Sequence, residues 1–140
     1  MHRSDALFVR EATAGDSALI EAHRAAAAAE TTRYRGEHVE SPARAHVVSV
    51  VAGVGETVFG SLVADSDDGL SWSISHVFVE PEAREVGLGD SMVLHLLHVL
   101  RGRGATRLGS QAQPGNRALK NLFERHGLVA QTILVGRSID

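Results

Sequence analysis

The sequence predicts a single α/β domain over residues 1–140, with a central sheet covered by helices. Three segments rich in valine or alternating in polarity predict consecutive antiparallel strands at His46–Val54, Thr57–Ala64 and Ser71–Glu80. An apolar stripe with helical period follows over Asp90–Arg101. A chain of 140 residues suffices for one such sheet and is too short for two independent cores.

The remaining elements follow in order along the chain. Leu7–Ala12 reads as a short strand, and polar residues before Ser17–Thr31 suit the start of a helix. Residues 32–45 are charged and show no clear period, which predicts a loop or an irregular short helix. Three further elements are expected, a strand at Arg107–Gln113, a helix at Asn116–His126 and a final strand at Val129–Ile139.

Composition excludes several classes of protein. A net charge of -3 and a pI near 6.2 give no general attraction to phosphate backbones, so we expect no nucleic-acid partner. No window of about 18 apolar residues is present, so we expect no membrane span. The polar start lacks the design of a secretory signal and the chain has no cysteine, which favours a cytoplasmic protein.

The segment Arg84-Glu85-Val86-Gly87-Leu88-Gly89 joins the third of these strands to the amphipathic helix. The start of a helix leaves backbone amides without intrahelical partners and carries about half a positive charge. Glycines let phosphate oxygens approach such amides closely, so a diphosphate group is the natural ligand. The motif alone is a weak signal, because many strand-to-helix turns look the same.

In its context, this segment resembles the Q/R-x-x-G-x-G/A pyrophosphate signature of the GNAT superfamily of coenzyme A-dependent N-acetyltransferases. The stretch Asn116–Leu128 is similar to the family's N-x-x-A-x-x-L-Y-E-x-x-G-F pattern, at the expected separation. The opening Val9–Asp16 also resembles the family's first strand and turn. Together these matches extend over almost the full chain.

The resemblance implies a mixed, mostly antiparallel sheet whose fourth and fifth strands splay apart around the pantetheine of acetyl-CoA, the acyl donor. The amine would attack the thioester directly, with no covalent enzyme intermediate and no metal. The residues expected to bind the coenzyme are Val77, Phe78, Val79, Arg84, Glu85, Val86, Gly87, Leu88, Gly89, Asp90, Asn116 and Phe123.

The chain departs from the family pattern at its catalytic positions. Phe123 replaces the tyrosine that donates a proton to the departing thiolate in the family. Ser73 and Gln111 stand where family members carry a catalytic glutamate, and neither is a useful base near pH 7. His76 is our candidate base because its ordinary pKa suits the task, with Glu80 as a second candidate. A histidine packed in the sheet without any catalytic task is the alternative.

Other polar residues have two interpretations each. Glu85 and Asp90 stand where relatives carry basic residues, which predicts weaker coenzyme binding, although Asp90 also suits the first turn of a helix. Asn116 would contact coenzyme or acceptor, or only cap its helix. We expect His95 and His98 to be solvated, with metal binding as the less favoured alternative. We also expect Arg101, Arg103 and Arg107 to be solvated, with contacts to the 3'-phosphate of the coenzyme as the less favoured alternative.

The leading hypothesis is therefore an acetyl-CoA-dependent N-acetyltransferase that acts on a primary amine, either a small molecule or a peptide end. The acceptor site would form between the loop Tyr34–Ala45 and the final strand. The alternative, motivated by Phe123, Ser73 and Gln111, is a non-catalytic acyl-CoA-binding or interaction module on the same fold. A homodimer whose partner strand completes the acceptor pocket is compatible with both.

Overall fold

The structure is a computed structural model that describes residues 6–30, 44–113 and 115–139. Five strands form one sheet in the order β1-β2-β3-β4-β5. Their bounds are β1 Leu7–Glu11, β2 His46–Val54, β3 Thr57–Ser66, β4 Ser71–Val79 and β5 Arg107–Gly109. The helices are η2 Ala14–Asp16, α1 Ser17–Glu30, η4 Pro81–Ala83, α2 Leu88–Gly102 and α3 Arg117–Arg125. The predicted α/β fold with a mixed, mostly antiparallel sheet is confirmed.

The first four strands pair antiparallel, which the sequence had predicted for β2, β3 and β4. Gly55 lies in the β2–β3 turn with a φ of 63°, a conformation that glycine adopts without strain. The β3–β4 register shifts between Val63 and Ala64, so β4 carries an extra residue, Ser75, at this point. Beyond this bulge His76 and Phe78 face one side of the sheet, toward α1, while Ile74 and Val77 contribute to the core on the other side.

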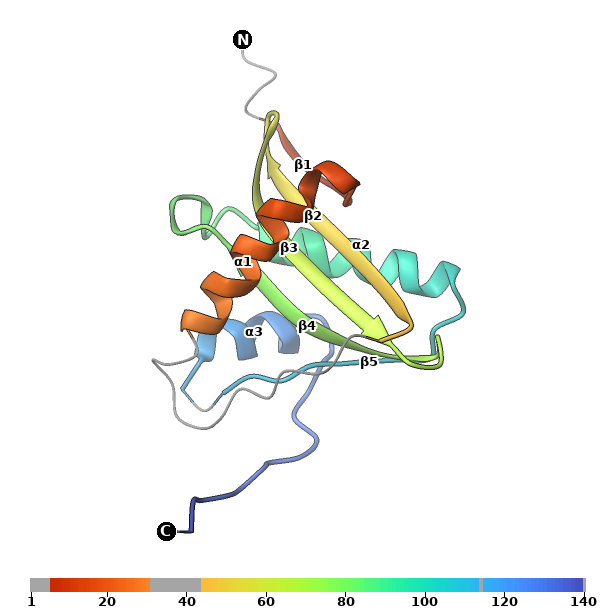
Figure 1. Ribbon diagram of the computed structural model, residues 1–140, viewed down its shortest axis with the longest axis vertical. Helices are drawn as coiled ribbons and strands as arrows, with labels where there is room; N and C mark the ends of the chain where they lie inside the picture. The colour runs from red at the N-terminus through yellow and green to blue at the C-terminus, as the bar shows by residue number, and fades with distance from the viewer. Residues whose placement is uncertain (1–5, 31–43, 114, 140) are drawn as a thin grey trace.

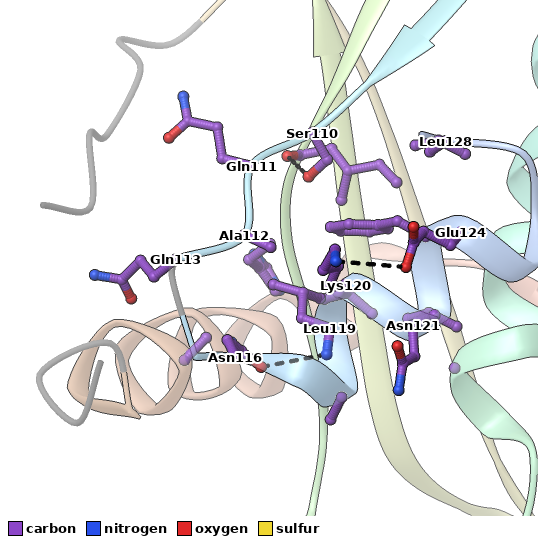
Figure 2. A pocket seen from close by; sticks show the side chains of 18 of the residues that line it. Ser110, Gln111, Ala112, Gln113, Asn116, Leu119, Lys120, Asn121, Glu124 and Leu128 are labelled. Carbon is purple, nitrogen blue, oxygen red and sulfur yellow. Dashed lines mark hydrogen bonds and ion pairs between the residues drawn. The ribbon is translucent and has the colours of Figure 1, made fainter. Parts of the chain in front are cut away.

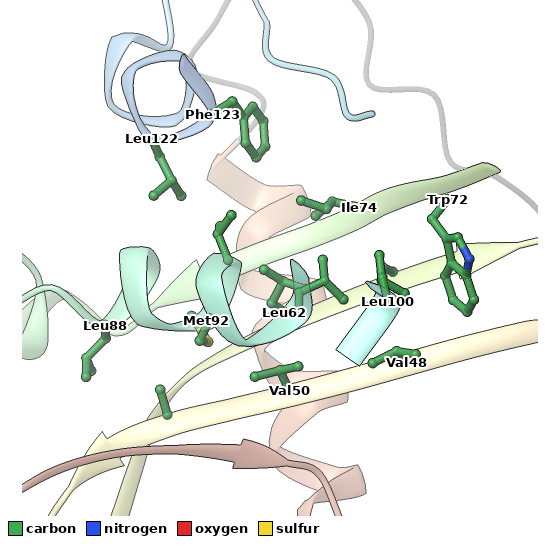
Figure 3. Close-up of a cluster of buried hydrophobic side chains, with 14 of the residues drawn as sticks. Val48, Val50, Leu62, Trp72, Ile74, Leu88, Met92, Leu100, Leu122 and Phe123 are labelled. Atoms are coloured by element: carbon green, nitrogen blue, oxygen red, sulfur yellow. The ribbon is translucent and has the colours of Figure 1, made fainter. Parts of the chain in front are cut away.

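Helices cover both faces of the sheet (Figure 1). α1 packs on one face against β3 and β4, and α2 packs on the other against all four antiparallel strands. α3 lies on the α2 side, where a Cβ atom added to Gly89 would come within 3.5 Å of the Leu122 side chain. The apolar core lies between the sheet and these two helices, and Leu62, Met92 and Leu96 are fully buried there (Figure 3).

The fourth and fifth strands separate, as expected from the resemblance. β5 pairs with β4 in parallel over three positions, from Ser71–Arg107 to Ser73–Gly109. The next contact is a side-chain hydrogen bond from Ser110 Oγ to the Ile74 carbonyl oxygen, at 3.1 Å. β4 continues to Val79, so its second half has no partner strand on this edge among the described residues.

Two sequence predictions are wrong. The strand predicted at Arg107–Gln113 ends at Gly109, because β5 diverges from β4 after three pairs. The strand predicted at Val129–Ile139 does not form: its described residues have no regular secondary structure and pair with no strand. Ile133 and Val135 in this segment are 85% and 88% exposed, so the burial that selects a strand is missing.

The other predicted bounds agree with the structure within two residues, and helix α2 begins at Leu88, two residues earlier than expected. The loop predicted between α1 and β2 falls almost entirely on residues 31–43, outside the described residues. Among the helices that the structure describes, none combines the length and the apolar character needed to cross a bilayer.

Candidate functional site

The loop from β4 to α2 is the first component of the site. Its backbone turns through η4 and then reaches Gly87, the N-cap of α2, whose φ of 90° is left-handed. The first helical hydrogen bond runs from the Ser91 amide to the Gly87 carbonyl oxygen, at 3.0 Å. The amides of residues 85–89 find no acceptor among the described residues. These donors lie at the positive end of a helix of 15 residues, which is the arrangement that binds phosphates.

Glu85 also has a left-handed backbone, with a φ of 71°, and is the one described residue other than glycine with positive φ. This conformation costs a residue with a Cβ atom roughly 1 kcal/mol. The Glu85 side chain is exposed. The solvated interpretation of this carboxylate therefore agrees with its position.

The open edge of β4 is the second component. The Glu80 amide donates to the Phe59 carbonyl oxygen of β3, at 2.8 Å. Because successive residues of a strand direct their backbone groups to opposite edges, Val77 and Val79 direct theirs away from β3, toward the gap beside β5. Phe78 directs its backbone groups to β3 and its ring to α1, 5.1 Å from the His23 ring. Only the two valines of this segment thus offer hydrogen bonds to a ligand in the gap.

An open cleft of about 2290 Å³ connects these components. Its walls include the end of β4, the loop before α2, the segment after β5, helix α3 and residues 127–138. Figure 2 shows the part of the cleft beside α3, where Lys120 lies 4.0 Å from Glu124 and Asn116 caps the helix. Both expected coenzyme-binding segments contribute to this cleft, with residues 77–79, 84–85 and 87–90 in its wall.

Arg84 fixes the entry to the loop. Its Nε donates to the Val79 carbonyl oxygen at 2.7 Å, and a terminal nitrogen donates to Glu30 of α1 at 2.6 Å. Its guanidinium also lies 5.3 Å from the centre of the Phe78 ring. Arg84 therefore links the end of β4 to α1, and its charge is partly balanced by Glu30.

Asp90 points to α3. Its carboxylate accepts hydrogen bonds from His126 Nε2 at 2.7 Å and from two nitrogens of Arg125, at 3.1 and 3.2 Å. The hydrogen bonds from Arg125 hold the pKa of Asp90 below its usual range. Asp90 lies in the first turn of α2, where a carboxylate was expected to suit the helix start. Its hydrogen bonds also connect α3 to α2.

Asn116 and Phe123 both belong to α3 and its cap. The Asn116 Oδ1 atom accepts a hydrogen bond from the Leu119 amide at 3.2 Å, which is the capping role. Phe123 is buried in the apolar cluster beneath α2 and also lines the cleft. Its phenyl ring brings no hydroxyl group to this part of the cleft wall.

His76 lines the cleft and contacts a buried polar chain that the sequence did not predict. His76 Nε2 lies 3.2 Å from Ser61 Oγ, and Ser61 Oγ lies 2.8 Å from His23 Nδ1. His23 Nε2 in turn lies 3.1 Å from a carboxylate oxygen of Glu80. Burial, followed by the proximity of His23 and Arg24, lowers the pKa of His76 to about 4, so that His76 is neutral at pH 7.

The two candidate bases thus belong to one connected group. Glu80 itself is not among the described residues that line the cleft, and it connects to His76 only through His23 and Ser61. Ser61 is fully buried and His23 is 3% exposed. A histidine inside an alanine-rich helix is the one signal in the sequence that could have drawn attention to His23.

The remaining candidates lie apart from the helix start. Ser73 and Gln111 both line the cleft, one half-buried and the other exposed. Arg103 is near Glu11, whereas Arg107 lines the cleft and donates a hydrogen bond to Gln131. The rings of His95 and His98 lie 6.4 Å apart, and no group of three metal-ligating side chains occurs among the described residues.

Comparisons with known proteins agree with this architecture. The model of the acetyltransferase (GNAT) family matches residues 16–128. An aminoglycoside N-acetyltransferase, AAC(6')-Iy, in complex with CoA superposes with a TM-score of 0.72 at 14% identity, over 99% of this chain and 98% of that one. A transcriptional regulator from Bacillus halodurans gives a TM-score of 0.69 at 20% identity, over 96% of this chain and 100% of that one.

A ribosomal-protein-alanine N-acetyltransferase from Brucella melitensis gives a TM-score of 0.64 at 16% identity, over 96% of this chain and 99% of that one. A search of curated proteins by sequence gives no match. At such identities the solved structures are evidence for the fold alone, and the family rests on the match over residues 16–128.

Proposed function

Because this chain belongs to the GNAT acetyltransferase family, as the match over residues 16–128 shows, we propose that it transfers the acetyl group of acetyl-CoA to a primary amine. The observation that carries the proposal is the group of unpartnered amides at residues 85–89, beside the open edge of β4. A diphosphate fits these donors, and an extended pantetheine fits the valines of β4.

The residues present fit the coenzyme. The amides of residues 85–89 would hold the pyrophosphate, and the backbone groups of Val77 and Val79 would bind the pantetheine as an added strand does. One constraint comes from Arg84, which already occupies the Val79 carbonyl oxygen. When bound, acetyl-CoA supplies the acyl group, and the chain supplies position and proton transfer.

The loop carries little positive charge of its own for an anionic ligand. Glu85 is exposed beside the amides, and Arg84 is paired with Glu30. We therefore expect weaker binding of acetyl-CoA than a lysine-rich loop would give, with a dissociation constant above the submicromolar range. Titration calorimetry checks this expectation, and a submicromolar constant would contradict it.

His76 is the group that would accept the proton of the attacking amine. It lines the cleft, and its lowered pKa leaves it neutral and therefore able to accept a proton at pH 7. The same lowered pKa makes a cationic His76 unfavourable in its surroundings. Efficient transfer therefore requires that the proton does not stay on this ring.

The acceptor is a primary amine of a small molecule or of a peptide. The solved structures of similar fold include AAC(6')-Iy with a bisubstrate analogue of CoA and acetylneamine and a ribosomal-protein-alanine N-acetyltransferase, so the likeness in fold is compatible with both classes. The loop at Tyr34–Ala45, which would help to form the acceptor site, lies almost entirely outside the described residues. Released thiol, measured with libraries of aminoglycosides, amino acids and peptides, would identify the class.

A second candidate, a non-catalytic acyl-CoA-binding module, is favoured by the buried phenyl ring of Phe123. The variant Phe123→Tyr distinguishes an acetyltransferase from a non-catalytic module, because the tyrosine hydroxyl would restore a proton donor in the cleft wall. An organised catalytic site predicts an increase in turnover of about tenfold or less, which corresponds to about 1.4 kcal/mol. Binding of acetyl-CoA with no turnover in either protein, for any amine, would support the module.

NMR provides the direct test of the binding site. On addition of acetyl-CoA, the amide signals of residues 85–89 and of Val77 should shift, whereas those of Gly102 and Arg103 at the far end of α2 should not. If the coenzyme leaves the loop amides undisturbed, the proposal is wrong, whatever the turnover.

A further inference from the structure

The chain of polar side chains from Glu80 to His76 crosses the interior between α1 and the sheet. It consists of Glu80, His23, Ser61 and His76, joined by contacts of 3.1, 2.8 and 3.2 Å. The two middle members are buried, and the Glu80 side chain is 32% exposed. The His76 end of this group of four side chains therefore reaches the cleft, and the Glu80 end reaches solvent outside the cleft.

The hydrogen positions in this chain follow from its ends. A carboxylate only accepts hydrogen bonds, so His23 Nε2 donates to Glu80. A neutral His23 then accepts at Nδ1, and the Ser61 hydroxyl donates to it. The oxygen of that hydroxyl accepts from His76 Nε2–H, which leaves the lone pair of His76 on Nδ1. With both rings neutral and Glu80 ionised, this is the one arrangement in which each of the three contacts is a hydrogen bond.

We propose that His23 and Ser61 are positioning residues, which hold His76 as the Nε2–H tautomer and pass the proton that it accepts to Glu80. The inference rests on the proposed function for its catalytic part. One N–H bond of the attacking amine breaks and one forms at His76 Nδ1. The His76 Nε2 proton moves to Ser61, the hydroxyl proton moves to His23 Nδ1, and the His23 Nε2 proton neutralises the Glu80 carboxylate.

This path explains how a ring that resists a positive charge serves as a base. Burial is the largest cause that lowers the pKa of His76, and Arg24 of α1 lowers it further, while Glu21 of α1 acts in the opposite direction. If the proton moves on to Glu80, the charge is neutralised at the partly exposed end of the chain. Arg84, four residues after Glu80, is engaged by Glu30 and by Val79.

Nitrogen-15 NMR of the histidine rings tests the tautomer without any substrate. We expect His76 to show a protonated Nε2 and an unprotonated Nδ1 near pH 7. In Ser61→Ala, which removes the central hydroxyl, the ring should shift to a mixture of both tautomers. A matched control is Ser75→Ala, because Ser75 is exposed and bonds the Val63 carbonyl oxygen, outside the chain. A wild-type His76 protonated at Nδ1 would overturn the inference.

Kinetics test the transfer path once an amine substrate is known. We expect Ser61→Ala and His23→Leu to lower kcat by at least about tenfold with little change in the KM of the amine, because the path acts on proton transfer. His23→Gln keeps groups that donate and accept, and it should recover part of the loss. If Ser61→Ala folds and keeps the wild-type kcat, the path is refuted. If no amine is acetylated, the proposed function fails, and the tautomer measurement still decides the hydrogen-bond arrangement.

Discussion

The two faces of the sheet differ in what their helices bury. Beneath α2 and α3 the buried residues are almost all apolar, with Leu62, Met92 and Leu96 fully excluded from solvent. Beneath α1 the sheet buries Ser61 against His23. Polar groups are costly to bury and well-packed apolar ones are stabilising. The difference indicates that the α2 face provides most of the stability, whereas the α1 face holds the polar groups on which the proposed chemistry depends.

The largest expected effect concerns the α2 face. Leu96→Ala should lower the free energy of unfolding by about 2–5 kcal/mol, because it leaves a cavity in the core. Leu94→Ala on the same helix is the control: Leu94 is 58% exposed, and we expect a change within about 0.5 kcal/mol. Urea denaturation measures both. Equal losses in the two variants would show that α2 does not provide the core described here.

The α1 face should be the one sensitive to pH. The pKa of His76 is about 4 in the folded chain and about 6.5 in a model compound, so the unfolded chain binds more protons between these values. The free energy of unfolding should therefore fall as the pH drops from 6.5 to 4. The upper limit of the loss is on the order of 3 kcal/mol, since each pKa unit corresponds to about 1.4 kcal/mol.

His76→Gln should remove this part of the pH dependence, whatever its effect at pH 7. Urea denaturation of both proteins at pH 7 and pH 5 measures the difference between their slopes. Parallel losses of stability in the two proteins would show that His76 is not held neutral by its surroundings.

Much of the fold follows from local sequence patterns. The β2–β3 hairpin and helix α2 were predicted because periodicity and turn residues act over a few neighbouring positions. The final strand was predicted wrongly from the apolar residues of 129–139, since a strand also needs a partner, and partners are set by tertiary structure. The prediction for β5 was too long for the same reason, because β5 loses its partner strand after Gly109.

The candidate site also combines features that local sequence sets with features that only the tertiary structure sets. The loop at residues 84–89 could be predicted because its chemistry comes from backbone amides that a local motif arranges. The contact of His23 with Ser61 could not, because the two residues stand 38 positions apart and neither belongs to a motif. The sequence named His76 and Glu80 as separate candidates, and only the fold shows that two buried residues connect them.

A site built from backbone should be sensitive to backbone conformation, which glycine variants test. Gly87→Ala should weaken acetyl-CoA binding several-fold and destabilise the fold by about 1–2 kcal/mol, because Gly87 has a φ of 90°. Gly102 is the matched control at the other end of α2, with open space around a Cβ atom and no positive φ. Gly102→Ala should leave binding unchanged and stability unchanged or raised by about 0.5–1 kcal/mol. Calorimetry and urea denaturation give both quantities, and equal affinities in the two variants would argue against a site at the amides.

The smallest effect should come from Glu85, where strain and charge can be separated. Glu85→Gly relieves a positive φ and should raise the free energy of unfolding by less than about 1 kcal/mol, because the unfolded chain gains freedom at the same time. Glu85→Gln removes only the charge, so its stability should stay near that of the wild type. Both variants should bind acetyl-CoA more tightly in calorimetry, since each removes a carboxylate beside the amides that would hold a diphosphate. If Glu85→Gln binds no better than the wild type at low salt, the charge of Glu85 does not act on the coenzyme, and the weak binding expected of this loop needs another cause.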